Sequence, residues 1–208
     1  MQVDFIDKMG SDLTVVNAAR VSYAKTKELI DAKDEKLIKF LAEHNHWSPF
    51  GHASIQFRIK APIFVARQLV KHQVGLVWNE VSRRYVDYQP ELYEPKQWRG
   101  RPKNSKQGSD GEIELDKNEQ FRLKNTMEQC LIIYNSLIEM NVAPEQARMV
   151  LPQSMMTEWY WSGTLYAFAR VCQLRCAKDT QEETREIADQ ISELCAEHFP
   201  ISWKYLKK

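Results

Sequence analysis

The chain has 208 residues, enough for one substantial domain, and its 43% hydrophobic and 27% charged residues are ordinary for a globular protein. A formal net charge of +1 argues against a general nucleic-acid binder, which would carry a basic excess, so any anion binding has to be local. No stretch approaches the roughly 20 apolar residues of a membrane span, and the first residues lack the layout of a signal peptide. The four cysteines form no disulfide-like framework, so we expect a cytoplasmic protein without membrane contact.

The first third of the chain predicts helices separated by one strand. Helical patterns cover residues 11–24 and 34–44, and the stretch HNHWSPFGH that follows is turn-like because it contains a proline and a glycine. Residues 53–60 alternate apolar and polar side chains, which is typical of a half-buried strand. Pro62 is then expected at the first position of a helix that runs to about residue 72.

The rest of the chain is mostly helical by the same criteria. Residues 89–112 are the exception, because three prolines, three glycines and many charges predict a long, exposed and mobile loop or insertion. Helices are predicted over 113–140, 144–150, 165–177 (opened by Thr157 or Ser162) and 181–198. We therefore expect a helix-rich α+β fold with a small antiparallel or mixed sheet, as one domain over residues 1–208.

The segment VKHQVGLVWNEVSRRYVDY, residues 70–88, concentrates polar groups between apolar residues. A serine hydrolase is disfavoured, because Ser82 lies in no GxSxG turn and no acid is marked to orient His72. His44, His46 and His52 match no standard zinc spacing and have no neighbouring cysteine, so no metal site is predicted. Imidazoles that cap a turn or face a ligand are the better interpretation.

An anion site is the remaining chemical interpretation of this segment. The chain contains neither GxGxxG nor GxxxxGK[ST], so arginines and loop amides would have to hold any phosphate. Ser82, Arg83 and Arg84 together offer a hydroxyl, backbone N–H groups and guanidinium forks for a phosphate dianion. The alternative is that the two arginines make ordinary surface ion pairs, and Arg148 and Arg175 are equally ambiguous by themselves.

Four stretches in order resolve this ambiguity. They are VVNAARVSY (15–23), HWSPFGHASIQFRIKAPIFVARQLVKHQ (46–73), WNEVSRRY (78–85) and ARMVLPQSMMTEWYWSGTLYAFARVCQLRCAKDTQEE (147–183). Together they make the chain resemble the flavin-dependent thymidylate synthases, which methylate dUMP to dTMP with 5,10-methylenetetrahydrofolate, FAD and NADPH. The 89–112 region matches the family least.

The family fingerprint is RHR, seven residues and then serine, and this chain departs from it. Here the triplet is Lys71-His72-Gln73, and eight residues separate Gln73 from Ser82. The resemblance implies that this triplet contacts the flavin, so that Lys71 keeps a cation while Gln73 loses one. Arg83 stands where a glycine is usual.

The resemblance implies two sets of ligand-binding residues. Those expected to bind dUMP are Gln68, Lys71, Glu80, Val81, Ser82, Arg83, Arg84, Arg148 and Arg175. Those expected to bind FAD are His46, Ser48, Lys71, His72, Gln73, Glu80, Thr164, Tyr166 and Arg170. The dUMP set matches the family better than the FAD set, because Thr164, Tyr166 and Arg170 replace the usual Asn, Arg and Asn, and Gly51 replaces a common glutamate.

Arg175 is the expected catalytic residue, because the resemblance places it against the uracil. A fixed guanidinium there would favour the N3-deprotonated ring and make C5 more nucleophilic. The resemblance also implies a homotetramer with active sites shared between subunits, and no covalent attack by a protein side chain, so that Ser82 would be a ligand contact.

Two alternatives stay open. The changed Lys71, Gln73 and Arg83 are compatible with a related flavin enzyme that acts on another pyrimidine nucleotide. The altered flavin stretch is compatible with a nucleotide-binding protein that has no catalytic activity.

Overall fold

The computed structural model describes residues 1–86, 88–103 and 108–207. Four strands, β1 (Gln2–Met9), β2 (Ser54–Pro62), β3 (Leu76–Glu80) and β6 (Met156–Thr164), form a sheet in the order β1-β2-β6-β3 with every neighbouring pair antiparallel. Strands β4 (Trp98–Gly100) and β5 (Asp110–Ile113) form a separate antiparallel pair. The helices are α1 (Asp12–Arg20), α2 (Ala32–Glu43), α3 (Ile63–Leu69), α4 (Lys117–Glu139), α5 (Pro144–Ala147), α6 (Leu165–Arg175), α7 (Glu182–His198) and α8 (Pro200–Leu206), with 3-10 turns η1 (Val21–Tyr23), η2 (Ser48–His52) and η3 (Arg148–Val150).

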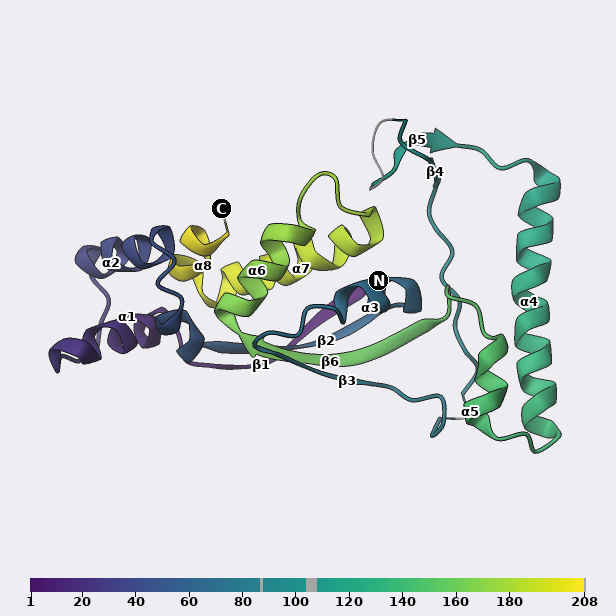
Figure 1. Ribbon diagram of the computed structural model, residues 1–208, viewed down its shortest axis with the longest axis horizontal. Coiled ribbons are helices and arrows are strands. Elements are labelled where there is room, and N and C mark those ends of the chain that lie inside the picture. Colours follow the sequence, from purple (N-terminus) through teal and green to yellow (C-terminus); the bar gives the residue numbers. More distant parts are fainter. Residues whose placement is uncertain (87, 104–107, 208) are drawn as a thin grey trace.

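The core lies between one face of the sheet and the helices α3, α6 and α7 (Figure 1). Alternation along β2 buries Ile55, Phe57 and Ile59, while Ser54, Gln56, Arg58 and Lys60 point to the other face. The predicted strand is therefore confirmed, and so is the helix-rich α+β class. All neighbouring strands of the described main sheet pair antiparallel, which decides between the antiparallel and mixed alternatives.

The segment before α6 is a strand, so the prediction that Thr157 or Ser162 opens a helix is wrong. In β6 the side chains of Thr157, Trp159 and Trp161 are buried, with a period of two. The helix begins after Thr164, whose hydroxyl oxygen accepts a hydrogen bond from the Ala167 backbone N–H at 3.2 Å. Two buried tryptophans made this segment compatible with a buried helix as well as with a strand.

Two further boundaries differ from the predictions. Pro62 is the last residue of β2 and precedes α3, which ends at Leu69 instead of near residue 72. The 89–112 region was predicted as a mobile loop, but its described part contains β4 and the start of β5, and the Tyr93 backbone N–H donates to the Ser154 carbonyl at 2.8 Å. Residues 104–107 of that region lie outside the described residues. Strands β1 and β3 and helix α8 were not predicted.

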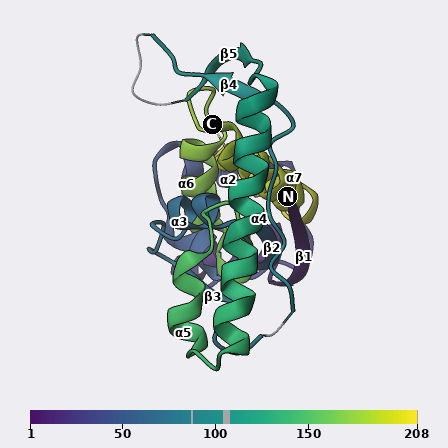
Figure 2. The ribbon, with the colours of Figure 1, turned by 90° about the vertical axis from the view of Figure 1, so that its right-hand side faces the viewer.

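Helix α4 stands apart from the sheet and runs beside α5, as Figures 1 and 2 show. Tyr134 is its one buried residue within the described chain. Its exposed large apolar side chains are those of Phe121, Ile132 and Ile133, followed by Met140 just beyond its end. Among the described residues, no helix is both long enough and apolar enough to cross a membrane.

Candidate functional site

Strand β3 separates the two polar ends of the 70–88 segment. Lys71, His72 and Gln73 precede the strand, whereas Ser82 and Arg84 follow it. β3 is an edge strand that pairs only with β6 in the described sheet, and its five residues span about 17 Å at roughly 3.3 Å per residue. One copy of the chain therefore does not bring the two predicted ligand surfaces together.

His72 and Arg175 meet at the first of these surfaces. His72 follows α3, Arg175 is the last residue of α6, and Arg175 Nε donates a hydrogen bond to His72 Nε2 at 3.0 Å. Burial lowers the pKa of His72, and the positive charges of Arg175 and Arg170 lower it further. Because arginine has only donors, His72 Nε2 is the unprotonated nitrogen and the imidazole is neutral with its proton on Nδ1.

A pocket of about 190 Å³ lies beside this hydrogen bond. It is lined by Lys71, His72, Gln73, Val74, Leu76, Ala167, Arg170, Val171 and Leu174. Lys71 and Arg170 are exposed cations, whereas the α6 side of the pocket is largely apolar. Such a mixture suits a ligand that combines an anionic group with a flat apolar one.

The turn between His72 and β3 is tied closely to the start of α6. Gly75 has a φ of +77°, in the left-handed region that glycine tolerates, and its carbonyl accepts from the Thr164 N–H at 3.1 Å. A Cβ on Gly163 would lie 2.5 Å from the Gly75 oxygen and 2.5 Å from the Leu76 side chain. The glycine pair thus permits the close approach of β6 to the loop.

The remaining predicted flavin residues lie around this turn on other elements. Tyr166 faces Trp47 with ring centroids 6.3 Å apart. Ser48 begins η2 and is exposed. His46 is also exposed and lies edge-on to the Phe40 ring at 5.7 Å. These residues belong to one end of the sheet, where η2 contacts both α6 and β6.

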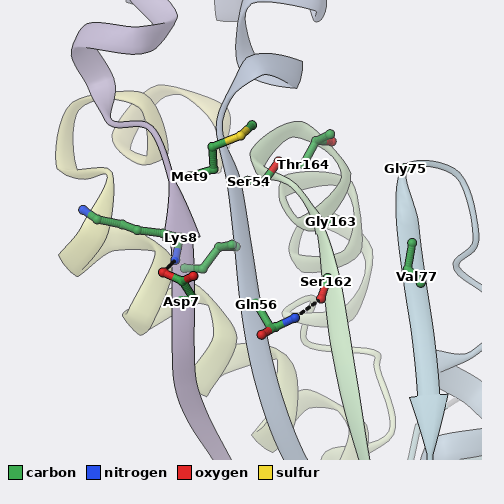
Figure 3. A pocket seen from close by; sticks show the side chains of 11 residues that line it. Asp7, Lys8, Met9, Ser54, Gln56, Gly75, Val77, Ser162, Gly163 and Thr164 are labelled. Carbon is green, nitrogen blue, oxygen red and sulfur yellow. Dashed lines mark hydrogen bonds between the residues drawn. The ribbon is translucent and has the colours of Figure 1, made fainter.

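The face of the sheet opposite the core carries a hollow of about 340 Å³ (Figure 3). Its lining consists of Asp7, Lys8, Met9, Ser54, Ile55, Gln56, Gly75, Val77, Ser162, Gly163 and Thr164. Gln56 Nε2 donates to Ser162 Oγ at 2.7 Å across β2 and β6. Thr164 is the one predicted site residue in this lining, so the hollow adjoins the predicted flavin region without coinciding with it.

Glu80 and Val81 are held at the second surface by β6. Glu80 Oε1 accepts from the Thr157 hydroxyl at 2.8 Å, and its Oε2 accepts from Trp78 Nε1 at 3.3 Å. The Val81 N–H donates to the Glu158 carbonyl at 2.9 Å. Both residues are exposed to solvent. The Glu80 carboxylate is therefore oriented by side chains of β3 and β6 before any ligand binds.

The two adjacent arginines of this surface differ in their surroundings. The Ser82 hydroxyl oxygen accepts from Arg84 Nε at 3.1 Å and from its backbone N–H at 3.3 Å, and Arg84 is exposed. Arg83 is 6% exposed, donates from Nη1 to the Tyr88 carbonyl, and lies 4.4 Å from the centre of the Tyr88 ring. Arg84 thus faces solvent, whereas Arg83 faces its own loop.

Gln68 and Arg148, which were also expected to bind dUMP, lie outside both of these surfaces. Gln68 is on α3, and its Oε1 accepts from the Thr184 hydroxyl at 2.5 Å. Arg148 is exposed and begins η3, which contacts α4 and α5. Helices α4 and α5 lie well apart from α6 in Figure 1. Thr184 was missed by the sequence analysis, because a threonine in the first turn of a helix carries no motif of its own.

Comparison with known protein families gives a nearly full-length match. A family model described as "Thymidylate synthase complementing protein" matches residues 4–201. The chain is 40% identical over 201 residues to a flavin-dependent thymidylate synthase of Thermus thermophilus, covering 97% of this chain and 73% of that protein. It is 39% identical over 204 residues to that of Kosmotoga olearia, covering 97% and 88%.

Solved structures share the fold of this chain. The UMP/dUMP methylase PolB from Streptomyces cacaoi, bound with 5-Br dUMP, superposes with a TM-score of 0.86 at 30% identity and covers 98% of this chain and 93% of that one. The same methylase bound with 5-Br UMP also gives a TM-score of 0.86, at 28% identity. The likeness therefore extends over the sheet, the helices and the segments that carry the predicted site.

Proposed function

Since the chain belongs to the flavin-dependent thymidylate synthase family, we propose that it methylates dUMP reductively to dTMP, with FAD as cofactor and 5,10-methylenetetrahydrofolate and NADPH as co-substrates. The observation that carries the proposal is the His72–Arg175 hydrogen bond within a chain that matches the family along almost its whole length. It joins a residue expected at the flavin to the residue expected at the uracil, as the transfer of a one-carbon unit between these ligands requires.

The side chains around the 190 Å³ pocket would suit one part of a flavin dinucleotide. Lys71 and Arg170 provide positive charge for a pyrophosphate, and the apolar side of α6 provides a surface for a ring. Thr164, Tyr166, His46 and Ser48 would hold the remaining parts. When bound, the flavin supplies the redox chemistry and the transfer of the one-carbon unit.

The protein's own contribution is orientation and charge. Arg175, held by His72, would place a fixed positive charge beside the pyrimidine carbonyls, where negative charge develops as C5 becomes nucleophilic. Ser82 and Arg84 would bind the phosphate, with Arg148 and Lys71 as further cations. Glu80, Val81 and Gln68 complete the proposed nucleotide set, whereas Arg83, which was also expected there, faces its own loop. Ser82 acts as a ligand contact and forms no covalent bond.

A homotetramer is part of the proposal, because the proposed nucleotide residues are spread over one chain. Arg148 lies beside α4, Arg84 follows β3, and Arg175 ends α6. Helix α4 also leaves Phe121 and Ile132 exposed, as a helix does when another subunit covers it. Sedimentation and light scattering of the purified protein should therefore give four times the mass of the 24.4 kDa chain.

The deciding experiment is tritium release from 5-tritiated dUMP by protein saturated with FAD, in the presence of methylenetetrahydrofolate and NADPH. Release coupled to dTMP formation supports the proposal, and the purified protein should also show a flavin absorption spectrum. Binding of dUMP without flavin uptake or tritium release would instead favour a nucleotide-binding protein without catalytic activity.

Use of UMP as well as dUMP is a second candidate. The similar protein from Streptomyces cacaoi is described as a UMP/dUMP methylase, and this chain carries Lys71, Gln73 and Arg83 at altered fingerprint positions. Mass analysis of the products from an equimolar mixture of UMP and dUMP separates the two candidates. Exclusive formation of dTMP would remove the second one.

We also propose a cytoplasmic location. The cysteines Cys130, Cys172, Cys176 and Cys195 are all free, which suits a reducing compartment. Cell fractionation with an antibody against the chain tests this directly.

A further inference from the structure

Thr184 is buried against Gln68, although nothing in the sequence pointed to a role for it. Its side chain is on the first turn of α7 and is 1% exposed. Its hydroxyl donates to Gln68 Oε1 at 2.5 Å, which links α7 to α3. A buried hydroxyl requires a partner, and here the partner is one of the residues proposed to bind the nucleotide.

In the structure this hydrogen bond engages the oxygen end of the Gln68 amide. An amide has an oxygen that accepts and a nitrogen that donates, and rotation by 180° exchanges them. Because the Thr184 hydroxyl donates to the oxygen, the Nε2 group is turned away from α7. Within the part of the chain that the structure describes, Gln68 Nε2 makes no hydrogen bond to another protein group.

The turn of α7 that carries Thr184 is itself held in place. Arg99 Nη2 donates to Glu183 Oε1 at 2.5 Å, and Arg99 Nε lies 3.3 Å from Glu182 Oε2. Arg99 belongs to β4, within the 89–112 region that resembles the family least. Two ion pairs on neighbouring residues therefore restrict the movement of the hydroxyl that orients Gln68.

We propose that Thr184 is a positioning residue that presents Gln68 Nε2 as a hydrogen-bond donor to an acceptor oxygen of the pyrimidine nucleotide. This inference rests on the proposed function, because it requires dUMP to bind at Gln68. A pre-oriented donor avoids the cost of fixing a rotatable amide when the nucleotide binds.

The test compares Thr184→Val with Thr184→Ser, using dUMP binding by calorimetry and steady-state kinetics on the flavin-loaded protein. Valine keeps the shape and burial but removes the hydroxyl, so the Kd and KM for dUMP should rise about fivefold, the effect of one neutral hydrogen bond, while kcat stays within about twofold. Serine keeps the hydroxyl and should stay within about twofold of the wild type in all three quantities. Equal Kd values for the wild type and the valine variant would overturn the role.

A double-mutant cycle separates positioning from a merely structural effect. If Thr184 acts through Gln68, then Thr184→Val should change dUMP affinity little once Gln68→Leu is present. An undiminished effect of Thr184→Val in the Gln68→Leu background would contradict the proposal. Should the valine variant not fold, Thr184→Ala, which suits a helix, takes its place in the same cycle.

Titration of the wild-type protein with dUMP distinguishes a failure of the proposed function from a failure of the role of Thr184. If the wild-type protein binds no dUMP, both the proposed function and the role of Thr184 fail. If it binds and converts dUMP while the cycle shows no coupling between Thr184 and Gln68, only the role of Thr184 fails.

Discussion

Arg175 Nε donates to His72 Nε2 at 3.0 Å, so the last turn of α6 is bound to the loop that follows α3. These residues are 103 positions apart in the chain. The bond does two things at once: it orients the guanidinium and it keeps Nε2 of the imidazole unprotonated. The proposed flavin and uracil contacts are thereby linked before either ligand binds.

Arg175→Ala should lower kcat for dTMP formation by about a hundredfold, because a preorganised positive charge at developing negative charge is worth about that much. Arg175→Lys keeps the charge but loses the planar fork and the bond from Nε, so its kcat should also fall, by a smaller factor. Single-turnover measurements check both values. Arg101→Ala, at an exposed arginine, is the control and should behave as wild type. Wild-type turnover in Arg175→Ala would refute the catalytic assignment.

The lowered pKa of His72 predicts a dependence of stability on pH. The unfolded imidazole titrates near its ordinary 6.5, whereas the folded one titrates lower, so between these values the unfolded state binds more protons. Stability should therefore fall as the pH drops from about 6.5 toward the folded pKa, because protonation places a cation against Arg175. Thermal unfolding of the wild type and of His72→Gln from pH 5 to 8 checks this. The difference between the two slopes should vanish above pH 7, and identical slopes throughout would contradict the prediction.

Arg84 and Arg83 should give different phenotypes although they are adjacent. Arg84→Ala should mainly raise the KM for dUMP, because its guanidinium is exposed beside the Ser82 hydroxyl, where both groups could bind a phosphate. Arg83→Ala should mainly loosen the loop, since Arg83 donates to the Tyr88 carbonyl and lies against the Tyr88 ring. Steady-state kinetics and limited proteolysis at residues 83–88 separate the two effects. A rise in KM alone for Arg83→Ala would show that this guanidinium turns to the nucleotide after all.

Gly163→Ala should destabilise the protein and disturb the flavin region. The added Cβ would lie 2.5 Å from the Gly75 carbonyl oxygen, so β6 and the Gly75 turn would have to separate, at a cost of about 1–3 kcal/mol. Denaturant unfolding and FAD titration measure the two consequences. Gly51→Ala is the matched control for the unfolding measurement, because a Cβ there meets the Trp47 ring at an ordinary 3.6 Å. Equal free energies of unfolding for both variants would show that the close approach of Gly163 to the Gly75 carbonyl is not required.

The sequence by itself determined the α+β class, the β2 strand, most helices and the order of the segments that place the chain in its family. Local patterns of the sequence are the period-two alternation in residues 53–60 and the apolar stripes of the helices. They reflect which side chains each strand or helix buries. The residue types proposed for the site could also be read from the sequence, because the hydrogen-bonding capacity of guanidinium, hydroxyl and imidazole groups follows from the residue type.

Only the tertiary structure decided how those residues are arranged. It made β6 a strand between two others, placed β3 at the sheet edge between the two ligand surfaces, turned Arg83 inward, and paired His72 with Arg175 and Gln68 with Thr184. Each of these depends on contacts between residues distant in the chain or on burial by neighbouring elements. Such contacts form only when the packed core brings the elements together, so no local pattern of the chain records them.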